Sequence, residues 1–297
     1  MIWKEYPDIV AKHILLEENE NILNKDLSQF EFPLIIKPVW WTASFWVQKI
    51  HNMKELVECV KDIKWSMEKL SDYWLNKKNI VIEEFIDGQL YAITYFVDED
   101  QKIYLTKPIL QGDKANGKNP MLMYGIINEE MKNHIDKNQL EDFVNQTIKW
   151  WKIRNTFVCH QFKKTSEWKL KTIELNWRIW GFNIEMYKLS YWINFFKFVF
   201  DEKYKFSNEI INNSATFWIY ADEEIDFNWY KEMILNTVKT LESLKWEIFQ
   251  NNTWSKIWPP QLGYYYYGIV LLKNEDSEQF SRDFNYVKEN YFNLLKK

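Results

Sequence analysis

The chain has 297 residues, enough for a sizeable core, and its net charge of −4 comes from interspersed signs, which offers no basic face for nucleic acid. Its two cysteines are too few for a disulfide framework and suit a reducing compartment. The first residues lack the apolar stretch of a signal peptide, and the aromatic stretch Tyr191 to Phe200 is too short to span a bilayer, so we expect a soluble, cytoplasmic protein without membrane or nucleic-acid partners.

Apolar runs and helical spacing define the elements expected in the first half of the chain. Asn52 is the expected N-cap of the helix, and the pair Asp87–Gly88 is an expected turn. The expected elements are strands at 33–39 and 47–50, a helix at 52–63, a strand at 79–86, and a hairpin of two runs at 89–98 and 101–110.

The second half continues with a polar segment and then mixed elements. The segment from Gly112 to Tyr124 is expected to be a mobile loop. The elements expected after it are a helix at 139–151, a hairpin of strands at 156–164 and 170–178, helices near 183–200, 229–244 and 278–296, and strands near 214–220 and 265–272. This order predicts an α+β fold with largely antiparallel sheets.

Tryptophan is unusually frequent and glycine unusually rare. An average chain of this length has roughly twenty glycines, whereas this one has seven glycines and seventeen tryptophans, together 24. With glycine in place of tryptophan, "KPVWWTASFWV" becomes a flexible small-residue loop and "ELNWRIWGFN" becomes "ELNGRIGGFN". Our hypothesis is that a codon meaning glycine in the source organism has been read as tryptophan. The alternative is a genuinely tryptophan-rich protein.

Lys37 ends an apolar strand directly before this loop. If Trp40, Trp41 and Trp46 are glycines, the loop backbone can adopt positive φ and bring its N–H groups close to an anion. Lys37 then adds a positive charge, and Ser44 offers a hydroxyl hydrogen bond. Taken alone, a lysine before a small-residue loop is more often a surface turn.

Two further segments carry polar side chains in a suggestive pattern. The segment "VIEEFIDG" is either a hinge that contacts adenine or a plain buried strand that ends at a turn. In "ELNWR", strand alternation puts Glu174, Asn176 and Arg178 on one face, with Gln161 on the preceding strand of the hairpin. Carboxylate and amide oxygens suit Mg²⁺, and the arginine suits a transferring phosphoryl group. The alternative for this segment is the solvent face of an amphipathic strand.

The remaining candidates for chemistry have simpler interpretations. His13, His51, His134 and His160 lack partners at metal-ligand spacing, so we interpret all four as structural or surface residues, with His160 pointing away from Gln161. Cys159 has no adjacent base that would make it a nucleophile.

In this order along the chain, the three segments resemble the ATP-grasp superfamily, and most closely its carboxylate–amine ligases. Lys37 and its loop resemble the phosphate lysine and glycine-rich loop, and "ELNWRIWG" resembles the motif E-x-N-x-R-x-G-G. "SYWIN" resembles the helix that usually follows, with tryptophan at the glycine position. The site residues that the resemblance implies are, for ATP, Lys37, Trp40, Trp41, Ser44, Trp46, Glu83, Glu84, Phe85 and Ile86; for the metal, Gln161, Glu174 and Asn176; and for catalysis, Arg178.

The resemblance implies an ATP-grasp fold of two α+β lobes with ATP between them. ATP and Mg²⁺ would activate a small-molecule carboxylate as an acyl phosphate, which an amine then attacks to form an amide. The expected divisions are an N-terminal remnant at 1–32, a small lobe at 33–88, a large lobe with the metal site at 89–200, and a C-terminal extension at 201–297.

The sequence departs from the family pattern in three places. The first metal position, thirteen residues before Glu174, is Gln161 rather than an acid, and the usual ribose glutamate is replaced by Leu90. Only 36 residues precede Lys37, so we expect the chain to be part of a longer ligase. Two other functions remain open: a nucleotide-binding pseudoenzyme or inactive fragment, and an aromatic-rich interaction module that binds no nucleotide.

Overall fold

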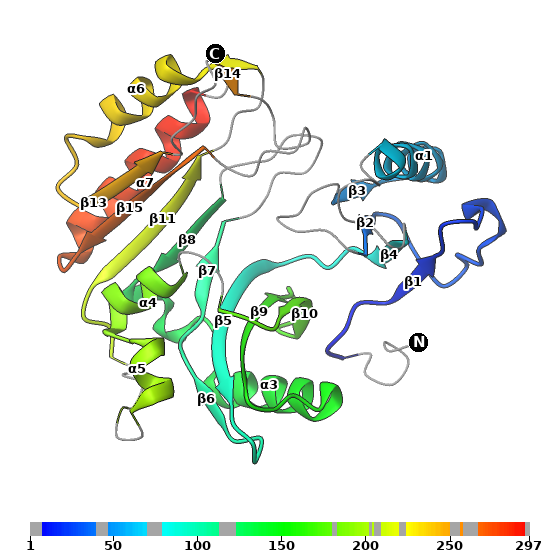
Figure 1. The fold of residues 1–297 in the computed structure, drawn as a ribbon, viewed down its shortest axis with the longest axis horizontal. Coiled ribbons are helices and arrows are strands. Elements are labelled where there is room, and N and C mark those ends of the chain that lie inside the picture. The colour runs from blue at the N-terminus through cyan, green and yellow to red at the C-terminus, as the bar shows by residue number, and fades with distance from the viewer. Residues whose placement is uncertain are drawn as a thin grey trace. The chain divides into compact units, whose positions relative to one another are not determined.

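The structure is a computed structural model. It describes residues 8–39, 47–69, 79–112, 123–179, 183–201, 204, 209–219, 224–249, 256–257 and 267–294. The chain forms two compact units (Figure 1). We call residues 1–87 with 116–119 the N-terminal unit, and residues 88–115 with 120–297 the large unit.

The N-terminal unit contains a four-stranded antiparallel sheet in the order β1-β4-β2-β3. Its strands are β1 (His13–Leu16), β2 (Leu34–Pro38), β3 (Gln48–Ile50) and β4 (Ile80–Glu84), joined by the short helix η2 (Ile22–Asn24) and helix α1 (Met53–Lys69). Leu34 and Ile36 of β2 alternate with more exposed residues and pack, with Ile82 of β4, against Leu56 and Ile63 of α1. Every second residue of the strand is buried, so one face of this sheet packs against α1.

Helix α1 begins with the cap that its sequence predicts. The backbone N–H of Glu55 donates to the side-chain oxygen of Asn52 at 3.0 Å, and the Glu55 carboxylate accepts the N–H of His51 at 2.8 Å. Asn52 thus satisfies a backbone donor of the first turn, and Glu55 reaches back to the residue before the cap, as in a capping box. The expected N-cap is confirmed, and the helix continues beyond the predicted residue 63 to Lys69.

The large unit is built on a nine-stranded antiparallel sheet. Its main order is β10-β9-β5-β7-β8-β11-β15-β13, with β6 paired to β5 and a separate pair β12–β14. The strands are β5 (Gln89–Val97), β6 (Ile103–Leu105), β7 (Ile109–Gln111), β8 (Met123–Ile127), β9 (Thr156–Lys164), β10 (Leu170–Asn176), β11 (Asn213–Ile219), β12 (Ile225–Asp226), β13 (Leu244–Phe249), β14 (Lys256–Ile257) and β15 (Gly268–Asn274). The helices are η3 (Glu129–Asn133), α3 (Lys137–Trp151), α4 (Asn183–Tyr191), α5 (Phe195–Phe200), α6 (Phe227–Val238) and α7 (Ser277–Leu294).

Strand alternation divides the helices of the large unit between the two sheet faces. Phe217 and Val270 pack in the cluster with α6 and α7, whereas Ile109 and Leu271 pack with Met186 of α4. Successive residues of a strand point to opposite faces, so α4 covers the face opposite to α6 and α7 (Figure 1). We call the α4 side the inner face.

Most of the expected elements are present, and the exceptions are instructive. The segment predicted as one helix near 183–200 is two helices. The helix predicted near 229–244 ends at Val238, and the strand β13 at Leu244–Phe249 was not predicted. Strands β1 and β8 were not predicted, and Met123 and Tyr124 belong to β8 rather than to the expected loop. The rest of that loop, 113–122, lies outside the described residues.

Candidate active site

Lys37 lies on the face of the N-terminal sheet opposite to α1. Its neighbour Ile36 is fully buried against the helix, so alternation turns Lys37 the other way. Its Nζ lies 2.7 Å from Oε2 of Glu83 on the adjacent strand, and the two side chains are 25% and 21% exposed. Lys37, expected to bind phosphate, and Glu83, expected in the adenine hinge, therefore form an ion pair on one face of the sheet.

A second cation lies on this face, and sequence reasoning missed it. Lys49 of β3 stands directly opposite Ile35 of β2, whose side chain shares the face of Lys37. The Lys49 ammonium lies 3.7 Å from the ring centre of Phe85, a cation–π contact. The available signal was strand alternation: once the two strands are paired, Lys49 and Lys37 fall on the same face of the sheet.

The other residues expected at the ATP site are only partly described. Glu84 Oε1 accepts the backbone N–H of Lys12 at 3.1 Å, so this carboxylate helps to hold the segment before β1, and Ile86 is buried. Trp40, Trp41, Ser44 and Trp46 lie outside the described residues, as does Trp180.

In the large unit, the hairpin of β9 and β10 brings together the expected metal ligands. Glu174 stands directly opposite Gln161, and Asn176 stands opposite Cys159. A register shift between Thr172 and Glu174 sets this pairing. Directly opposed residues share a face, with Cβ atoms about 5 Å apart, so the oxygens of Gln161 and Glu174 can reach one cation.

Arg178 differs from the strand pattern that the sequence suggested. Strand β10 ends at Asn176, and Arg178 follows in an exposed bend, so strand alternation does not fix the direction of its side chain. Arg178 is nevertheless close enough to Cys159 to act on the pKa of its thiol, as is Glu174. Both charged residues are therefore in the neighbourhood of the same hairpin.

Gln161 is held by a second glutamine that the sequence analysis missed. Gln161 is 8% exposed, and its Nε2 donates to Oε1 of Gln111 on β7 at 3.1 Å. This hydrogen bond uses the amide nitrogen of Gln161 and leaves the amide oxygen as the atom available to a cation. Gln111 lies fifty residues earlier in the chain, so no local spacing could indicate the pair.

The ligand set fits a hard cation that is shared with phosphate oxygens. Within the described part of the chain, no group of three or more His, Cys, Asp or Glu side chains could hold a metal. Gln161, Glu174 and Asn176 supply one carboxylate and two amide oxygens. Such a set suits Mg²⁺, which usually keeps waters and substrate phosphates among its ligands rather than relying on a full protein cage.

Neighbouring titratable groups are neutral and take structural roles. Burial, followed by the charge of Glu174, raises the pKa of the Cys159 thiol to about 12, and Arg178 opposes this rise. His160 is fully buried on the opposite face, stacked on Phe143, and burial lowers its pKa to about 3. Its Nε2 lies 3.0 Å from the Thr172 hydroxyl. The expectation that His160 points away from Gln161 is confirmed.

Two cavities in the large unit differ in their relation to these residues. One, of about 10 Å³, lies on the inner face, and its lining is formed by Leu90, Gln111, Gly112, Tyr124, Gly125, Asn183, Thr216 and Trp218. It shares Gln111 with the hydrogen bond to Gln161, and the buried Trp218 is the largest side chain in its lining. None of its lining residues was among the site residues expected from the sequence.

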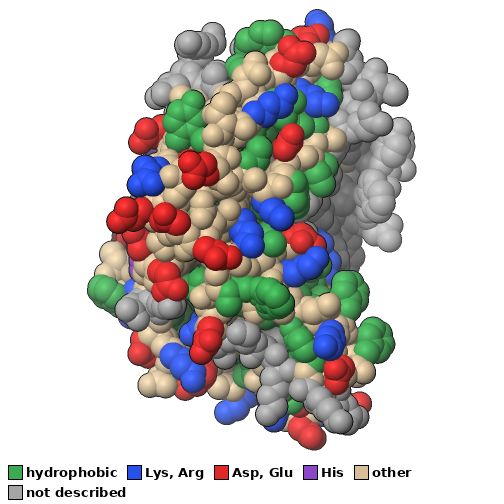
Figure 2. Space-filling model, turned by 90° about the vertical axis from the view of Figure 1, so that its left-hand side faces the viewer, with side chains coloured by type: hydrophobic (Ala, Val, Ile, Leu, Met, Phe, Trp, Pro, Cys, Tyr) green, Lys and Arg blue, Asp and Glu red, His purple; other side chains and the backbone are tan. Residues whose placement is uncertain are grey.

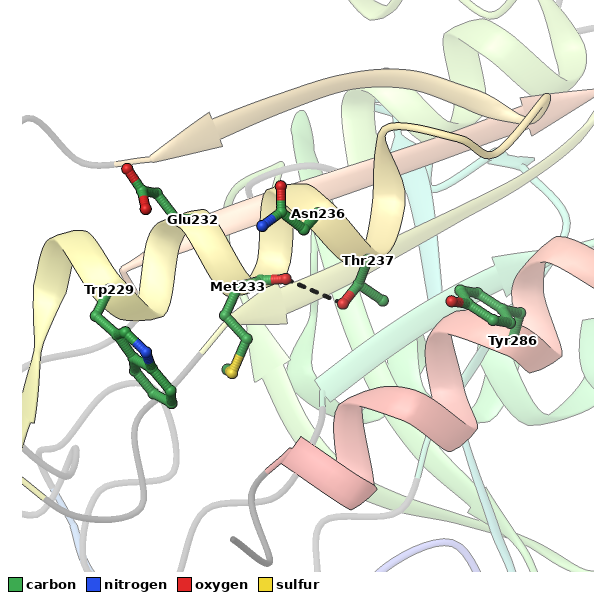
Figure 3. Close-up of a pocket in the computed structure, with 6 residues that line it drawn as sticks. All are labelled: Trp229, Glu232, Met233, Asn236, Thr237 and Tyr286. Atoms are coloured by element: carbon green, nitrogen blue, oxygen red, sulfur yellow. Dashed lines mark hydrogen bonds between the residues drawn. The ribbon is translucent and has the colours of Figure 1, made fainter.

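The other cavity, of about 440 Å³, is a surface groove between α6 and α7. Figure 3 shows Trp229, Met233 and Thr237 along α6 and Tyr286 on α7. None of the site residues expected from the sequence lines this groove, and α6 and α7 cover the outer face of the sheet. Figure 2 shows acidic and basic side chains interspersed over one described surface of the molecule.

Comparison with known protein families identifies the part of the chain that contains the expected site residues. Residues 30–184 match the family model described as an ATP-grasp domain, and this range contains Lys37, Glu83, Gln161, Glu174 and Arg178. The chain belongs to the ATP-grasp family. No curated protein sequence matches the chain.

Solved structures with the ATP-grasp fold resemble this chain along almost its whole length. An L-amino acid ligase from Bacillus licheniformis superposes with a TM-score of 0.74 at 16% identity, covering 97% of this chain and 70% of that one. The ADP complex of an N5-carboxyaminoimidazole ribonucleotide synthetase gives 0.68 at 10% identity, covering 99% and 70%. A phosphoribosylglycinamide synthetase from Anaerococcus prevotii gives 0.54 at 17% identity, covering 97% and 70%.

The family and the α+β fold predicted from the sequence are thus confirmed. These identities establish a shared ATP-grasp fold, and the chemistry of this chain follows from its own residues. Among the described residues, no helix is long and apolar enough to cross a membrane.

Proposed function

We propose that this ATP-grasp protein is a cytoplasmic, Mg²⁺-dependent ligase that joins a small-molecule carboxylate to an amine through an acyl phosphate. The observation that carries the proposal is the pairing of Glu174 with Gln161 across the β9–β10 hairpin, with Asn176 on the same strand. This pairing puts oxygen ligands of two strands side by side within the matched domain. The similarity to an L-amino acid ligase supports the same class of reaction.

The N-terminal unit supplies the groups for the nucleotide. Lys37 and Lys49 carry positive charge on one sheet face, and Glu83 balances Lys37 at 2.7 Å. A phosphate oxygen can replace Glu83 as the partner of Lys37, because both are anions that accept charged hydrogen bonds. Glu83, Glu84, Phe85 and Ile86 would then line the adenine end, and the loop with Trp40, Trp41, Ser44 and Trp46 would cover the phosphates.

The large unit supplies the groups for phosphoryl transfer. Glu174, Gln161 and Asn176 would hold Mg²⁺, which neutralises charge on the transferring phosphate. A carboxylate oxygen of the substrate attacks the γ-phosphorus, and the bond to ADP breaks. The amine then attacks the acyl carbon, phosphate leaves, and the nitrogen loses a proton. Arg178 would stabilise charge that develops on the phosphoryl group, so catalysis is mainly positioning and electrostatic.

We assign the substrate that receives no phosphate to the inner face beside the small cavity, whose volume of about 10 Å³ holds about one water, so the side chains that line it must move to admit a substrate. Gln111, Asn183 and Thr216 offer polar contacts there, and Gln111 connects it to Gln161. Trp218 is the largest side chain of this lining. We expect Trp218→Ala to admit bulkier substrates, whereas Trp229→Ala, on the exposed side of α6, leaves the order of substrates unchanged.

A second candidate is a nucleotide-binding protein that does not turn over ATP. Two observations favour it: Lys37 is already neutralised by Glu83, and the metal set holds a single carboxylate. Such a protein binds ATP but releases no phosphate when carboxylates and amines are supplied.

One assay separates the two candidates. We call the chain with Trp40→Gly, Trp41→Gly, Trp46→Gly, Trp177→Gly and Trp180→Gly the glycine-restored chain. ATP binding and phosphate release are measured on it with a panel of amino acids as carboxylate and amine. Phosphate release that requires both substrates, with an amide product, supports the ligase. Binding without release supports the second candidate, and no ATP binding rejects both.

A further inference from the structure

Two tryptophans have a backbone conformation that tryptophan rarely adopts. Among the described residues, the non-glycine positions with positive φ are Gln101, Lys152, Asn155, Trp168 and Trp192. The φ angles of Trp168 and Trp192 are 66° and 58°, in the left-handed region. In this region the Cβ of an L-residue comes too close to the carbonyl oxygen, which is energetically unfavourable, and bulky side chains are outliers there. Glycine has no Cβ and adopts this conformation freely.

Trp168 closes the hairpin that carries Gln161 and Glu174. Its N–H donates to the carbonyl of Thr165 at 3.0 Å, and the N–H of Thr165 donates to the carbonyl of Lys169 at 2.9 Å. These bonds define a three-residue hairpin loop whose last residue is left-handed and forms a bulge, a position at which glycine is preferred. The indole is 68% exposed, and Lys164 lies 3.8 Å above it, so it buries little apolar surface.

Trp192 directly follows helix α4. Its N–H donates to the carbonyl of Lys188 at 3.0 Å, which closes the left-handed motif that ends many helices. The next residue, Ile193, is buried, in keeping with the apolar contact that often accompanies this motif. The residue after the helix is usually glycine in this motif, yet here it is a tryptophan that is 74% exposed.

Both positions thus combine a glycine backbone with a side chain that packs against little. Trp218 is the contrast, because it is 8% exposed and fills space on the inner face, as an indole normally does. We propose that residues 168 and 192 are glycine in the native protein, and that tryptophan stands there because a glycine codon has been read as tryptophan. Backbone conformation then identifies individual reassigned positions, independently of ligase activity.

The thermodynamic test compares the same substitution in two backbone environments. Trp168→Gly and Trp192→Gly relieve the left-handed conformation, so each raises the urea midpoint and the Tm of the chain. The matched control is Trp65→Gly, since Trp65 is 57% exposed inside helix α1, where glycine weakens a helix. We expect this control to lower both values. A fall for Trp168→Gly or Trp192→Gly of the same sign as the control overturns the proposal.

The chemical test reads the residues directly. Peptides from the protein isolated from its own organism are sequenced by tandem mass spectrometry across positions 168 and 192. Glycine at both positions establishes the proposal, and an indole mass at either one overturns it, whatever the stability data. Neither measurement depends on catalysis, so an inactive protein leaves the proposal testable and failure of the proposal leaves the ligase assay decisive.

Discussion

The candidate residues of the two units are held in different ways. In the N-terminal unit, the cations already have partners: Lys37 pairs with Glu83, and Lys49 lies over Phe85. In the large unit, Glu174 is exposed, while the buried Gln161 is fixed through a neutral hydrogen bond to Gln111. Under the proposed function, Lys37 must exchange Glu83 for a phosphate oxygen when a nucleotide binds, whereas the amide oxygen of Gln161 is already oriented by the hydrogen bond to Gln111. This difference predicts separate effects on binding and on turnover.

The largest expected effect is on turnover and tests the large unit. In the glycine-restored chain, Glu174→Ala removes the single carboxylate of the metal set and should reduce phosphate release by about 100- to 1,000-fold, the scale for losing one key electrostatic contact. The matched control is Glu167→Ala, in the exposed turn of the same hairpin, which should leave the rate unchanged. Phosphate release retained in Glu174→Ala would refute the metal assignment.

Next in size is an effect on ATP affinity that tests the N-terminal unit. Lys37→Ala removes a charged hydrogen bond to phosphate and should raise the Kd for ATP about ten- to a hundredfold, from roughly 1.5–3 kcal/mol. Calorimetric titration measures it. Lys25→Ala breaks another ion pair of the same unit, with Glu20 at 2.6 Å, and should leave the Kd unchanged. Equal losses in the two variants would mean that Lys37 acts only on the fold.

A smaller effect, on stability, tests whether the large unit is preset. Gln111→Leu leaves the buried amide nitrogen of Gln161 without its acceptor, so the free energy of unfolding should fall by about 1–3 kcal/mol. Adding Gln161→Leu removes the stranded donor and should restore much of this loss. Urea unfolding of the two single variants and the double variant measures the coupling. Strictly additive losses would contradict the hydrogen bond.

The last prediction is a pH dependence that belongs to the opposite face of β9. His160 takes up a proton with a pKa of about 3 when folded, against an ordinary value of 6.5. Below pH 6.5, His160 binds a proton in the unfolded chain but not in the folded chain. The free energy of unfolding therefore falls as the pH falls towards 3, by about 1.4 kcal/mol per pH unit. Unfolding at several pH values should show a shallower slope for His160→Gln. Parallel slopes would mean that burial does not hold His160 neutral.

Local sequence patterns predicted the pieces of the fold that depend on near neighbours. The capped start of α1, the turn at Gly88 with φ of 96°, and the two strands of the β9–β10 hairpin all follow from residues a few positions apart. The order of Lys37, Glu83 and Glu174 was sufficient for the family resemblance. What failed was local as well: apolar spacing extended the predicted helix beyond the end of α6 at Val238 to the start of β13 at Leu244, because short apolar runs fit helix and strand equally.

The sequence by itself determined the family, the α+β class and the residue types that suit a nucleotide and a hard cation. Tertiary structure alone decided that Glu83 neutralises Lys37, that Gln111 orients Gln161, and that a register shift puts Glu174 opposite Gln161. It also decided which tryptophans have a glycine backbone. The physical reason is that strand pairing, ion pairs and φ angles depend on contacts between distant segments, which spacing along one chain does not encode.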